Sequence, residues 1–415
     1  NTNHSVVTIA EKNCRNVFTV TRKNRQNIHK YKTNENSQKP PTRGEGVSMK
    51  IIVNSLDLND AVAKVSKALP GKDVAPVLEC IKFTAENDKL TLYATDKDLA
   101  IEKTIDANVI VGGQMLVPGK IFAEYIRNIA DADSEVSLDT DENRLMISTG
   151  GSDCNIATLD VDDYPEVEEI GNSSYFAIVE RNLKALVNNV LFSVATDDSR
   201  PMLKGVYFEG TGYTLTAVAT DGYRFAMSKK PLEEKVERLT ATVPSRSLNE
   251  LFKLLGDGDD VLHVYIEGNY LLVTLPNTRL FTRLLAGQYI KYDNIVPREF
   301  VSTLTVNKAN FERSLNTASI MSRQEKNNLV LLDIDEYNMT ISSTSQYGTA
   351  KETVAVALSG KDINAAYNSR YINDCLRVIN ADTIKMEFAK HNGCIITIEN
   401  SDEVLYFILP VKQIN

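Results

Sequence analysis

The sequence has few of the residues and none of the short motifs on which most metal sites and active sites depend. Its 415 residues include five cysteines and four histidines. No two cysteines form a CxxC pair and no HExxH or Cys/His cluster occurs, which argues against a zinc site. An odd number of scattered thiols is typical of a reducing cytosol. The chain also lacks a P-loop, a GxGxxG fingerprint, a GxSxG elbow and a His-paired nucleophile, so we expect no enzymatic site, no cofactor and no metal.

Long apolar runs are absent as well. No stretch reaches the ~18 apolar residues of a membrane span, and the N-terminal segment lacks the apolar core of a secretory signal. A hydrophobic content of 43% and a charged content of 24% are ordinary for a globular protein. These observations predict a cytoplasmic protein with no membrane partner, and the length allows about two to four domains.

Residues 1–48 differ in composition from the rest of the chain. They contain nine Lys or Arg and three Asp or Glu, a net charge of +6, whereas the whole chain carries −9, so residues 49–415 carry −15. This Asn-rich segment has no periodic pattern and is predicted to be a disordered basic extension. Met49 then opens an alternating apolar run, like a natural start. We interpret residues 1–48 as translated upstream sequence or an artefact of expression; the alternative is a genuine basic tail that binds nucleic acid.

The body of the chain contains one unit three times. Two patterns recur with spacings of 124 to 126 residues between corresponding positions. A fixed long period indicates tandem domains of one architecture rather than a short-repeat solenoid. The first pattern occupies residues 89–105, 213–232 and 338–356, and the second occupies residues 116–138, 242–264 and 366–386.

Each unit is predicted to be α+β, with two helices on an antiparallel sheet. A short strand leads into a helix with apolar residues at helical spacing, such as Leu58, Val62, Val65 and Leu69 in the first unit. A second helix follows a Ser or Pro, and alternating runs with Asp, Asn or Gly at the turns predict hairpins between the helices. The predicted domains span residues 49–171, 172–298 and 299–415.

Charge is distributed unevenly between the expected helices and the rest of the body. All six helix windows have a net charge of +1 or +2, together +7, so the remainder of the body carries −22. For any single helix this is an ordinary solvated face, but the same sign in all six suggests one helix-lined surface that faces phosphate. The windows are residues 56–72, 118–130, 180–195, 244–255, 307–323 and 369–380.

Five segments in a specific order give the body a family resemblance. They are SRPMLKGVYFE (199–209), VATDGYRFA (218–226), VPSRSL (243–248), TRLLAGQY (282–289) and YFILPVK (406–412). In these, the chain resembles the bacterial DNA polymerase III beta subunit, the sliding clamp, over residues 49–415. The resemblance implies a DNA-clamp fold, in which two chains form a head-to-tail ring dimer with twelve helices lining the hole. Duplex DNA would pass through the hole, and the ring would tether the polymerase III catalytic subunit for processive synthesis.

The resemblance also implies a peptide pocket for short linear motifs of the polymerase, the clamp loader, other polymerases and repair proteins. Leu, Phe, Pro and Val would form an apolar slot for leucine or phenylalanine anchors, and Arg and Lys at the rim would pair with acidic groups. Asp221 is interpreted as a turn residue and not as a catalytic base. The implied pocket residues are Arg200, Leu203, Thr220, Gly222, Tyr223, Arg224, Phe225, Ile295, Phe407, Leu409, Pro410, Val411 and Lys412.

Two departures from the family pattern affect this pocket. Ile290 stands where the family often has Pro, and Asn294 where it often has a basic residue, so the lip of the pocket is expected to differ in shape or partner preference. The third copy of the motif, SSTSQYGTA, lacks the Asp-Gly pair and the Arg. We therefore expect one pocket per chain, at the junction of domains two and three.

Contacts with DNA and with a second chain are expected elsewhere. Lys72 stands where the family has a basic residue that points at the duplex, and helix polarity adds Arg127, Arg181, Arg246 and Lys253. Ile320 and Met321 match the apolar patch of the ring interface. Cys154 falls where the partner surface often has a larger apolar residue, which puts the strength of the interface in doubt. The alternative function is a three-domain scaffold protein that forms no ring and does not tether DNA.

Overall fold

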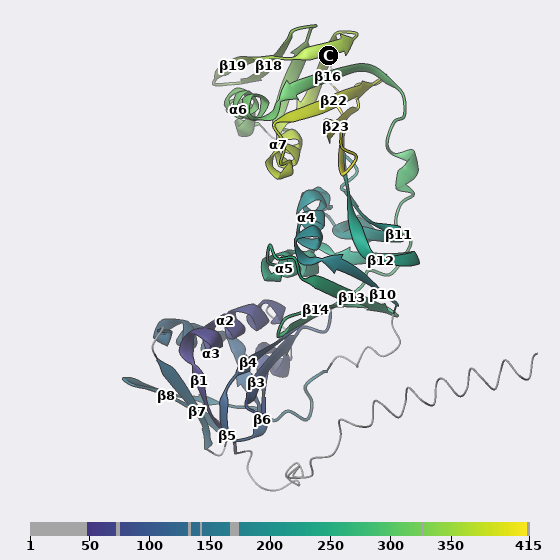
Figure 1. Ribbon diagram of the computed structural model, residues 1–415. Helices are drawn as coiled ribbons and strands as arrows, with labels where there is room; N and C mark the ends of the chain where they lie inside the picture. The colour runs from purple at the N-terminus through teal and green to yellow at the C-terminus, as the bar shows by residue number, and fades with distance from the viewer. Residues whose placement is uncertain are drawn as a thin grey trace, which may run out of the picture. The chain divides into compact units, whose positions relative to one another are not determined.

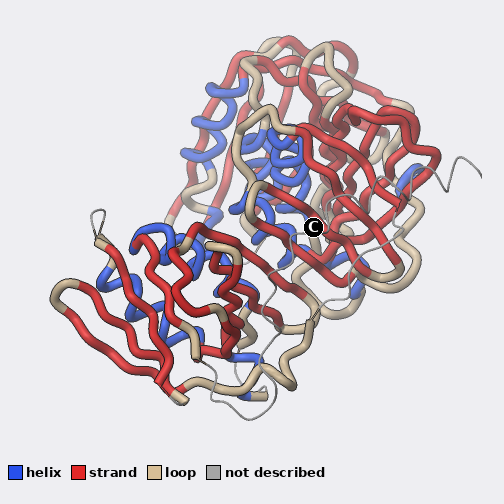
Figure 2. Tube along the Cα trace, turned by 60° about the horizontal axis from the view of Figure 1, so that its bottom comes forward, coloured by secondary structure: helices blue, strands red, loops and turns tan. Residues whose placement is uncertain are grey.

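The computed structural model describes residues 48–71, 75–131, 134–141, 143–166, 174–325 and 327–412. The predicted basic extension therefore lies outside the described residues, apart from Ser48. Three copies of one unit follow one another, from purple through teal to yellow in Figure 1. Strands outnumber helices in every copy (Figure 2), and the predicted α+β class is confirmed.

Copy one begins with a strand and a helix and repeats that order after a four-stranded stretch. Its elements are β1 (Lys50–Asn54), α2 (Ser55–Val65), η2 (Ser66–Ala68), η3 (Pro76–Glu79), β2 (Cys80–Glu86), β3 (Lys89–Thr95), β4 (Leu99–Asp106), β5 (Asn108–Val111), β6 (Gly113–Pro118), α3 (Gly119–Ile129), β7 (Glu135–Asp141), β8 (Arg144–Thr149) and β9 (Ser152–Ala157).

Copy two has the same order but fewer and longer strands. Its elements are β10 (Ser174–Val179), α4 (Glu180–Val190), η4 (Leu191–Ser193), η5 (Pro201–Lys204), β11 (Gly205–Thr220), β12 (Arg224–Pro244), α5 (Ser245–Leu254), β13 (Val261–Glu267), β14 (Tyr270–Leu275), β15 (Thr278–Arg283) and η6 (Tyr292–Asn294). Strands β11 and β12 form one long hairpin, in which Gly205 pairs with Pro244 at one end and Thr220 pairs with Phe225 at the other. Copy one builds the same part of its fold from the shorter strands β2, β3, β4 and β6.

Copy three returns to short strands. Its elements are β16 (Phe300–Asn307), α6 (Lys308–Ala318), η7 (Ser322–Gln324), β17 (Leu329–Ile334), β18 (Asn338–Ser345), β19 (Gly348–Ala355), β20 (Ala357–Gly360), β21 (Ile363–Asn368), α7 (Ser369–Val378), β22 (Thr383–Ala389), β23 (Cys394–Ile398) and β24 (Val404–Ile408).

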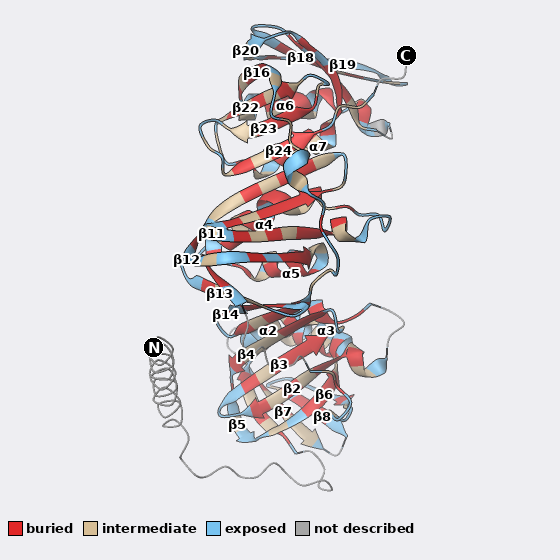
Figure 3. Ribbon diagram, turned by 90° about the vertical axis from the view of Figure 1, so that its right-hand side faces the viewer, coloured by how far each residue is buried: buried red, intermediate tan, exposed pale blue. Residues whose placement is uncertain are grey.

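Some of the helices begin at capping residues, and each buries the apolar face that its sequence pattern predicts. The side chain of Asn54 accepts hydrogen bonds from the backbone N–H groups of Leu56 (2.9 Å) and Asp57 (3.1 Å), which caps α2. Asn307 caps α6 in the same way, with a bond of 3.0 Å from Asn310. The apolar positions of each helix are buried in the core, and Figure 3 shows buried residues in red on the helices and on the strands. Within the described residues, no helix is both long and apolar enough to cross a membrane.

Two of the four sheets continue from one copy into the next. Strand β15 of copy two pairs antiparallel with β4 of copy one, which completes an eight-stranded sheet. Strand β24 of copy three pairs antiparallel with β12 of copy two in a seven-stranded sheet. The other two sheets each belong to one copy: the five-stranded sheet ends at β9, and the four-stranded sheet ends at β19. In Figure 1, α4 and α5 lie on the same side of their sheets as α6 and α7.

Candidate peptide site, DNA-facing helices and ring surfaces

The turn between β11 and β12 is held by its own side chains. The Asp221 carboxylate accepts hydrogen bonds from the backbone N–H groups of Tyr223 (2.9 Å) and Arg224 (3.0 Å), which is the turn role expected from the sequence. Thr220 donates its hydroxyl proton to the carbonyl oxygen of Arg224 (2.6 Å). Gly222 has a φ of +91°, and a side chain there would collide with the guanidinium of Arg200. Arg200 in turn donates to the Asp221 carbonyl oxygen at 3.1 Å.

Arg224 links copies two and three through a nearly buried guanidinium. It donates to the carboxylates of Asp221 (3.1 Å) and Asp374 (2.6 Å) and to the carbonyl oxygen of Phe192 (2.6 Å). Its central carbon also lies 4.6 Å from the ring centroid of Tyr371 on α7. Because these partners engage all three of its nitrogens, Arg224 is occupied inside the protein and does not present a free cation at the rim.

A satellite hydrophobic cluster lies under this turn and draws from both copies. We call it the junction cluster; its buried members are Ala195, Leu203, Val218, Phe225, Tyr289, Ile395 and Phe407. Ile295 packs against it from the segment after η6. The structure therefore brings together Leu203, Phe225, Ile295 and Phe407 of the pocket expected from the sequence.

Exposed apolar side chains border the junction cluster. Tyr223 is 64% exposed, Leu409 is 42% exposed, and Ile290 is 38% exposed. Leu409 follows β24 and lies against the turn, because its backbone N–H donates to the Tyr223 carbonyl oxygen at 3.0 Å. Pro410 and Val411 are half-buried beyond it, and Lys412 is exposed. A group of exposed apolar residues beside a buried cluster is typical of a docking surface.

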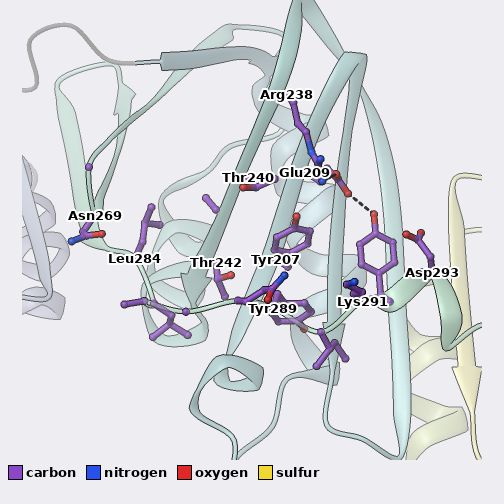
Figure 4. Close-up of a pocket in the computed structure, with 18 residues that line it drawn as sticks. Tyr207, Glu209, Arg238, Thr240, Thr242, Asn269, Leu284, Tyr289, Lys291 and Asp293 are labelled. Atoms are coloured by element: carbon purple, nitrogen blue, oxygen red, sulfur yellow. Dashed lines mark hydrogen bonds and ion pairs between the residues drawn. The ribbon is translucent and has the colours of Figure 1, made fainter.

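A cavity of about 790 Å³ lies on copy two beside the lip of the expected site (Figure 4). Its wall contains the stacked rings of Tyr207 and Tyr289, whose centroids are 5.1 Å apart. Tyr292 donates its hydroxyl proton to Glu209 at 2.6 Å, and Glu209 also accepts from Arg238 at 3.1 Å. Burial raises the pKa of Tyr289, and burial and the Glu209 hydrogen bond raise the pKa of Tyr292, so both phenols stay neutral at physiological pH.

Several residues of this region were missed by sequence reasoning. Tyr289 and Tyr292 stand in GQYIKYDN, where the sequence singled out only the departures Ile290 and Asn294. Two aromatic residues in a segment rich in turn residues were the signal that could have marked them as site residues. Asp374 had no such signal, because its partner Arg224 is 150 residues away.

The basic residues expected to face DNA lie on helices or at their ends, and most have an acidic neighbour. Lys72 lies outside the described residues. Arg127, in the last turn of α3, is exposed and has no ion-pair partner in the part of the chain that the structure describes. Arg181 pairs with Asp259, Lys253 pairs with Glu250 at 2.8 Å, and Arg246 pairs with Asp96 of copy one.

An acidic loop surrounds the start of α4. The GDGDD segment, residues 256–260, supplies Asp257 to Lys184 (3.0 Å) and Asp259 to Arg181. Its backbone carbonyl at Asp260 accepts the N–H of Glu180 at 2.8 Å, so the loop also caps the helix. Among the described residues, no three His, Cys, Asp or Glu side chains gather into a possible metal site.

The residues expected at a ring interface lie at the two unshared sheets. Cys154 is half-buried on the edge strand β9. Ile320, just after α6, is 52% exposed, and Met321 beside it is half-buried. The Met321 sulfur lies 3.9 Å from the hydroxyl oxygen of Ser345, at the end of β18.

Three α+β copies joined edge to edge define the clamp class of fold, and comparisons with known proteins agree. Sequence models of the DNA polymerase III beta subunit match the chain three times: the N-terminal domain at residues 49–168, the central domain at 177–291 and the C-terminal domain at 293–412. The chain belongs to the DNA polymerase III beta subunit family.

Relatives in this family are named beta sliding clamps. The beta sliding clamp of Staphylococcus epidermidis is 30% identical over 367 residues, covering 86% of this chain and 96% of the relative. That of Halalkalibacterium halodurans is 30% identical over 366 residues, covering 85% and 96%. The crystal structure of the DNA polymerase sliding clamp from Bacillus subtilis has a TM-score of 0.84 at 26% identity, covering 88% of this chain and all of that one. These matches support the function of a DNA sliding clamp and not that of a scaffold protein without DNA tethering.

Proposed function

We propose that two copies of this chain close head to tail into a ring around duplex DNA, and that the ring tethers the polymerase III catalytic subunit. Processivity then comes from topological linkage, and the chain contributes no chemistry of its own. The role places the protein in the cytoplasm, where the chromosome is copied.

Strand pairing between successive copies carries this proposal. In copy one, β4 pairs with β15 of copy two, and in copy two, the start of β12 pairs with β24 of copy three. The equivalent strands left over are β19 of copy three and β9 of copy one, each at the end of its sheet. An unpaired edge offers a row of hydrogen-bonding groups to another strand. Pairing of β19 with β9 of the partner subunit repeats the junction that the chain makes twice and closes the ring.

Charge pairing on the helices suits a ring that slides. Arg181, Arg246 and Lys253 each have an acidic neighbour, so their attraction to phosphate is reduced. Each DNA phosphate that a protein neutralises makes the slope of log affinity against log salt concentration steeper by about 0.9. A weak, sequence-independent contact keeps the duplex centred without holding it in place.

The junction of copies two and three is proposed as the docking site for client proteins. Its exposed Tyr223, Leu409 and Ile290 border a buried apolar cluster, which suits a short linear motif with leucine or phenylalanine anchors. Clients of this kind are the polymerase, the clamp loader, other polymerases and repair proteins. Lys412 is exposed at the end of the same segment and is free to pair with an acidic group of the motif.

Binding of a short fluorescent peptide tests the docking site, with anisotropy as the readout and a motif that carries leucine and phenylalanine anchors as the probe. We expect Leu409→Asp to weaken binding by a factor of about 30, the loss of roughly 2 kcal/mol at an anchor position. Tyr213→Asp is the matched control, because Tyr213 is 61% exposed on β11, away from the junction cluster. Equal affinity of the wild type and Leu409→Asp would contradict this site.

A further inference from the structure

The two junctions within the chain share an ion pair between a turn and a helix. At the first, Asp96 in the turn after β3 pairs with Arg246 on α5. At the second, Arg224, at the end of the turn after β11, pairs with Asp374 on α7 at 2.6 Å. In both cases the helix is the second helix of the following copy, and the turn precedes the strand that crosses the junction.

The repeat identifies the equivalent positions on α3, the second helix of copy one. Aligning VPGKIFAE, VPSRSLNE and YNSRYIND places Lys120 with Arg246, Ile121 with Tyr371, and Glu124 with Asp374. At the second junction, Tyr371 faces the turn, with the guanidinium of Arg224 over its ring. Ile121 is thus the α3 residue expected to face the turn of the neighbouring copy.

The turn of copy three differs from the other two in chemistry. It joins β18 to β19 through Ser345, Gln346, Tyr347 and Gly348 and has no charged side chain. Neither ion pair seen within the chain can be rebuilt from this turn. Tyr347 at its tip is 72% exposed, and Ile121 on α3 is 61% exposed. Both are large apolar side chains held out into solvent at the unshared ends of the chain.

We propose that Tyr347 of one subunit packs against Ile121 of the partner subunit, so that an apolar contact replaces the turn-to-helix ion pair at the junction between chains. This inference rests on the proposed ring. Ile320 and Met321 extend the apolar surface on the Tyr347 side, because the Ser345 hydroxyl in the same turn lies 3.9 Å from the Met321 sulfur. Burial of apolar surface is not screened by salt, whereas an exposed ion pair is. The dimer is therefore held with little dependence on ionic strength.

Sedimentation of the full chain tests the contact by measuring the monomer–dimer dissociation constant. Measurements at about 0.1 M and about 1 M NaCl reduce the Debye length from about 10 Å to about 3 Å. The wild-type constant is expected to change by less than about threefold between the two. Ile121→Lys and Tyr347→Glu are each expected to raise it at least about tenfold, a change of about 1.4 kcal/mol.

The double variant Ile121→Lys with Tyr347→Glu distinguishes direct contact from general damage. It can rebuild an ion pair of the kind found at the other junctions, so it is expected to recover dimerisation at low salt and lose it at high salt. Tyr347→Phe keeps the aromatic side chain and should dimerise like the wild type. Tyr213→Glu, at another exposed tyrosine on β11, is the control for added charge. Thermal unfolding of each variant checks that the monomer remains folded.

Three results would contradict the proposal, and they differ in what else they rule out. A wild-type dimer whose dissociation constant is unchanged by both single substitutions would refute the Tyr347–Ile121 contact and leave the ring. A wild-type chain that stays monomeric at every concentration would remove the ring and the contact together. A wild-type dimer that dissociates when salt is added would show that charge, not apolar burial, holds the junction.

Discussion

Arg224 lies both at the junction of copies two and three and beside the proposed docking site. The family resemblance implies a pocket residue, yet its guanidinium donates to Asp221, Asp374 and the carbonyl oxygen of Phe192. The side chain is only 11% exposed, so its charge is compensated within the protein. Its place next to Tyr223 fixes the turn that bears the exposed apolar residues. Arg224 therefore joins copies two and three and holds the turn of the proposed docking surface.

Removal of this charge should destabilise the protein. Arg224→Met removes the guanidinium that the nearly buried Asp221 and Asp374 share, and leaves Asp374 with its longer pair to Arg377 at 3.6 Å. We expect the free energy of unfolding to fall by about 3 kcal/mol. Arg238→Met is the control, because Arg238 is 72% exposed in its pair with Glu209 and such pairs contribute less than about 1 kcal/mol. Urea denaturation measures both. Similar small losses in the two variants would contradict the structural role of Arg224.

The four described cysteines should differ sharply in reactivity. Burial, with a smaller contribution from the charge of Glu79, raises the pKa of Cys80 to about 11. Burial also raises the pKa of Cys375 and Cys394 well above that of a free thiol. At pH 8 only about one Cys80 thiol in a thousand is the reactive thiolate.

Alkylation with iodoacetamide followed by peptide mass spectrometry measures this difference. We expect Cys154, half-buried on β9, to react first among the four, and more slowly as protein concentration rises and β9 pairs with the partner subunit. Unfolding in urea should equalise the four rates. Native labelling of Cys375 as fast as that of Cys154 would contradict the buried placement of Cys375.

At the scale of elements, an acidic loop compensates the basic residues near the start of α4. Helix α4 has Arg181 and Lys184 near its start, and both pair with carboxylates of the acidic loop 256–260. The excess of basic residues that the sequence shows for its helices is thus partly neutralised within the fold. We expect this arrangement to weaken the attraction of the helices for DNA without removing it.

Neutralising the acidic loop should strengthen DNA binding. The double variant Asp257→Asn with Asp259→Asn releases two cations, and we expect it to bind a short duplex about tenfold more tightly at low salt and with a steeper salt dependence. Asp198→Asn with Asp402→Asn removes two equally exposed acids from loops away from α4 and serves as the control. Filter binding over a salt series measures the slope. An identical slope in both double variants would exclude this role of the loop.

Helices were easier to predict from the sequence than the connections between copies. The periodic apolar residues of α2 and α5 fixed their positions, because a helix buries one face whatever its neighbours are. The sequence predicts a hairpin between the helices of copy two but not its length, because residues 233–240 are mostly polar and have no alternating apolar pattern, yet they belong to β12, which pairs with β11. Pairing of β15 with β4 is likewise a contact between residues about 180 positions apart, as between Arg279 and Glu102, and no local pattern records it.

Only part of the candidate site could be predicted, because the rest depends on contacts between residues that are distant in the sequence. Leu203, Phe225 and Phe407 could be taken from recognisable segments, and they meet in the junction cluster. Tyr207 and Tyr289 were missed, because their stacking becomes visible only when β11 and the segment after β15 are side by side. The exposure of Leu409 and the occupation of Arg224 also depend on the tertiary packing of copy three against copy two.

At the scale of the whole molecule, the same strand pairing joins copy one to copy two and copy two to copy three, and the equivalent strands at the two ends of the chain have no such pairing within its described residues. The β4–β15 and β12–β24 pairings join the three copies, and β9 and β19 are left as equivalent edges. A second chain can complete both unfinished junctions at once. In the proposed ring, closure in this way would make the link to DNA topological, so that it would not depend on the affinity of any one contact.

Retention on circular and linear DNA is the most direct test of that link. The protein is loaded onto a nicked circle with a matched clamp loader and ATP at moderate salt, and the circle is then cut at one site. The account predicts that the protein stays on the intact circle and is lost from the cut DNA, because a closed ring slides off a free end. Equal retention on both forms that disappears as salt is added would mean direct electrostatic binding, and it would contradict the tether.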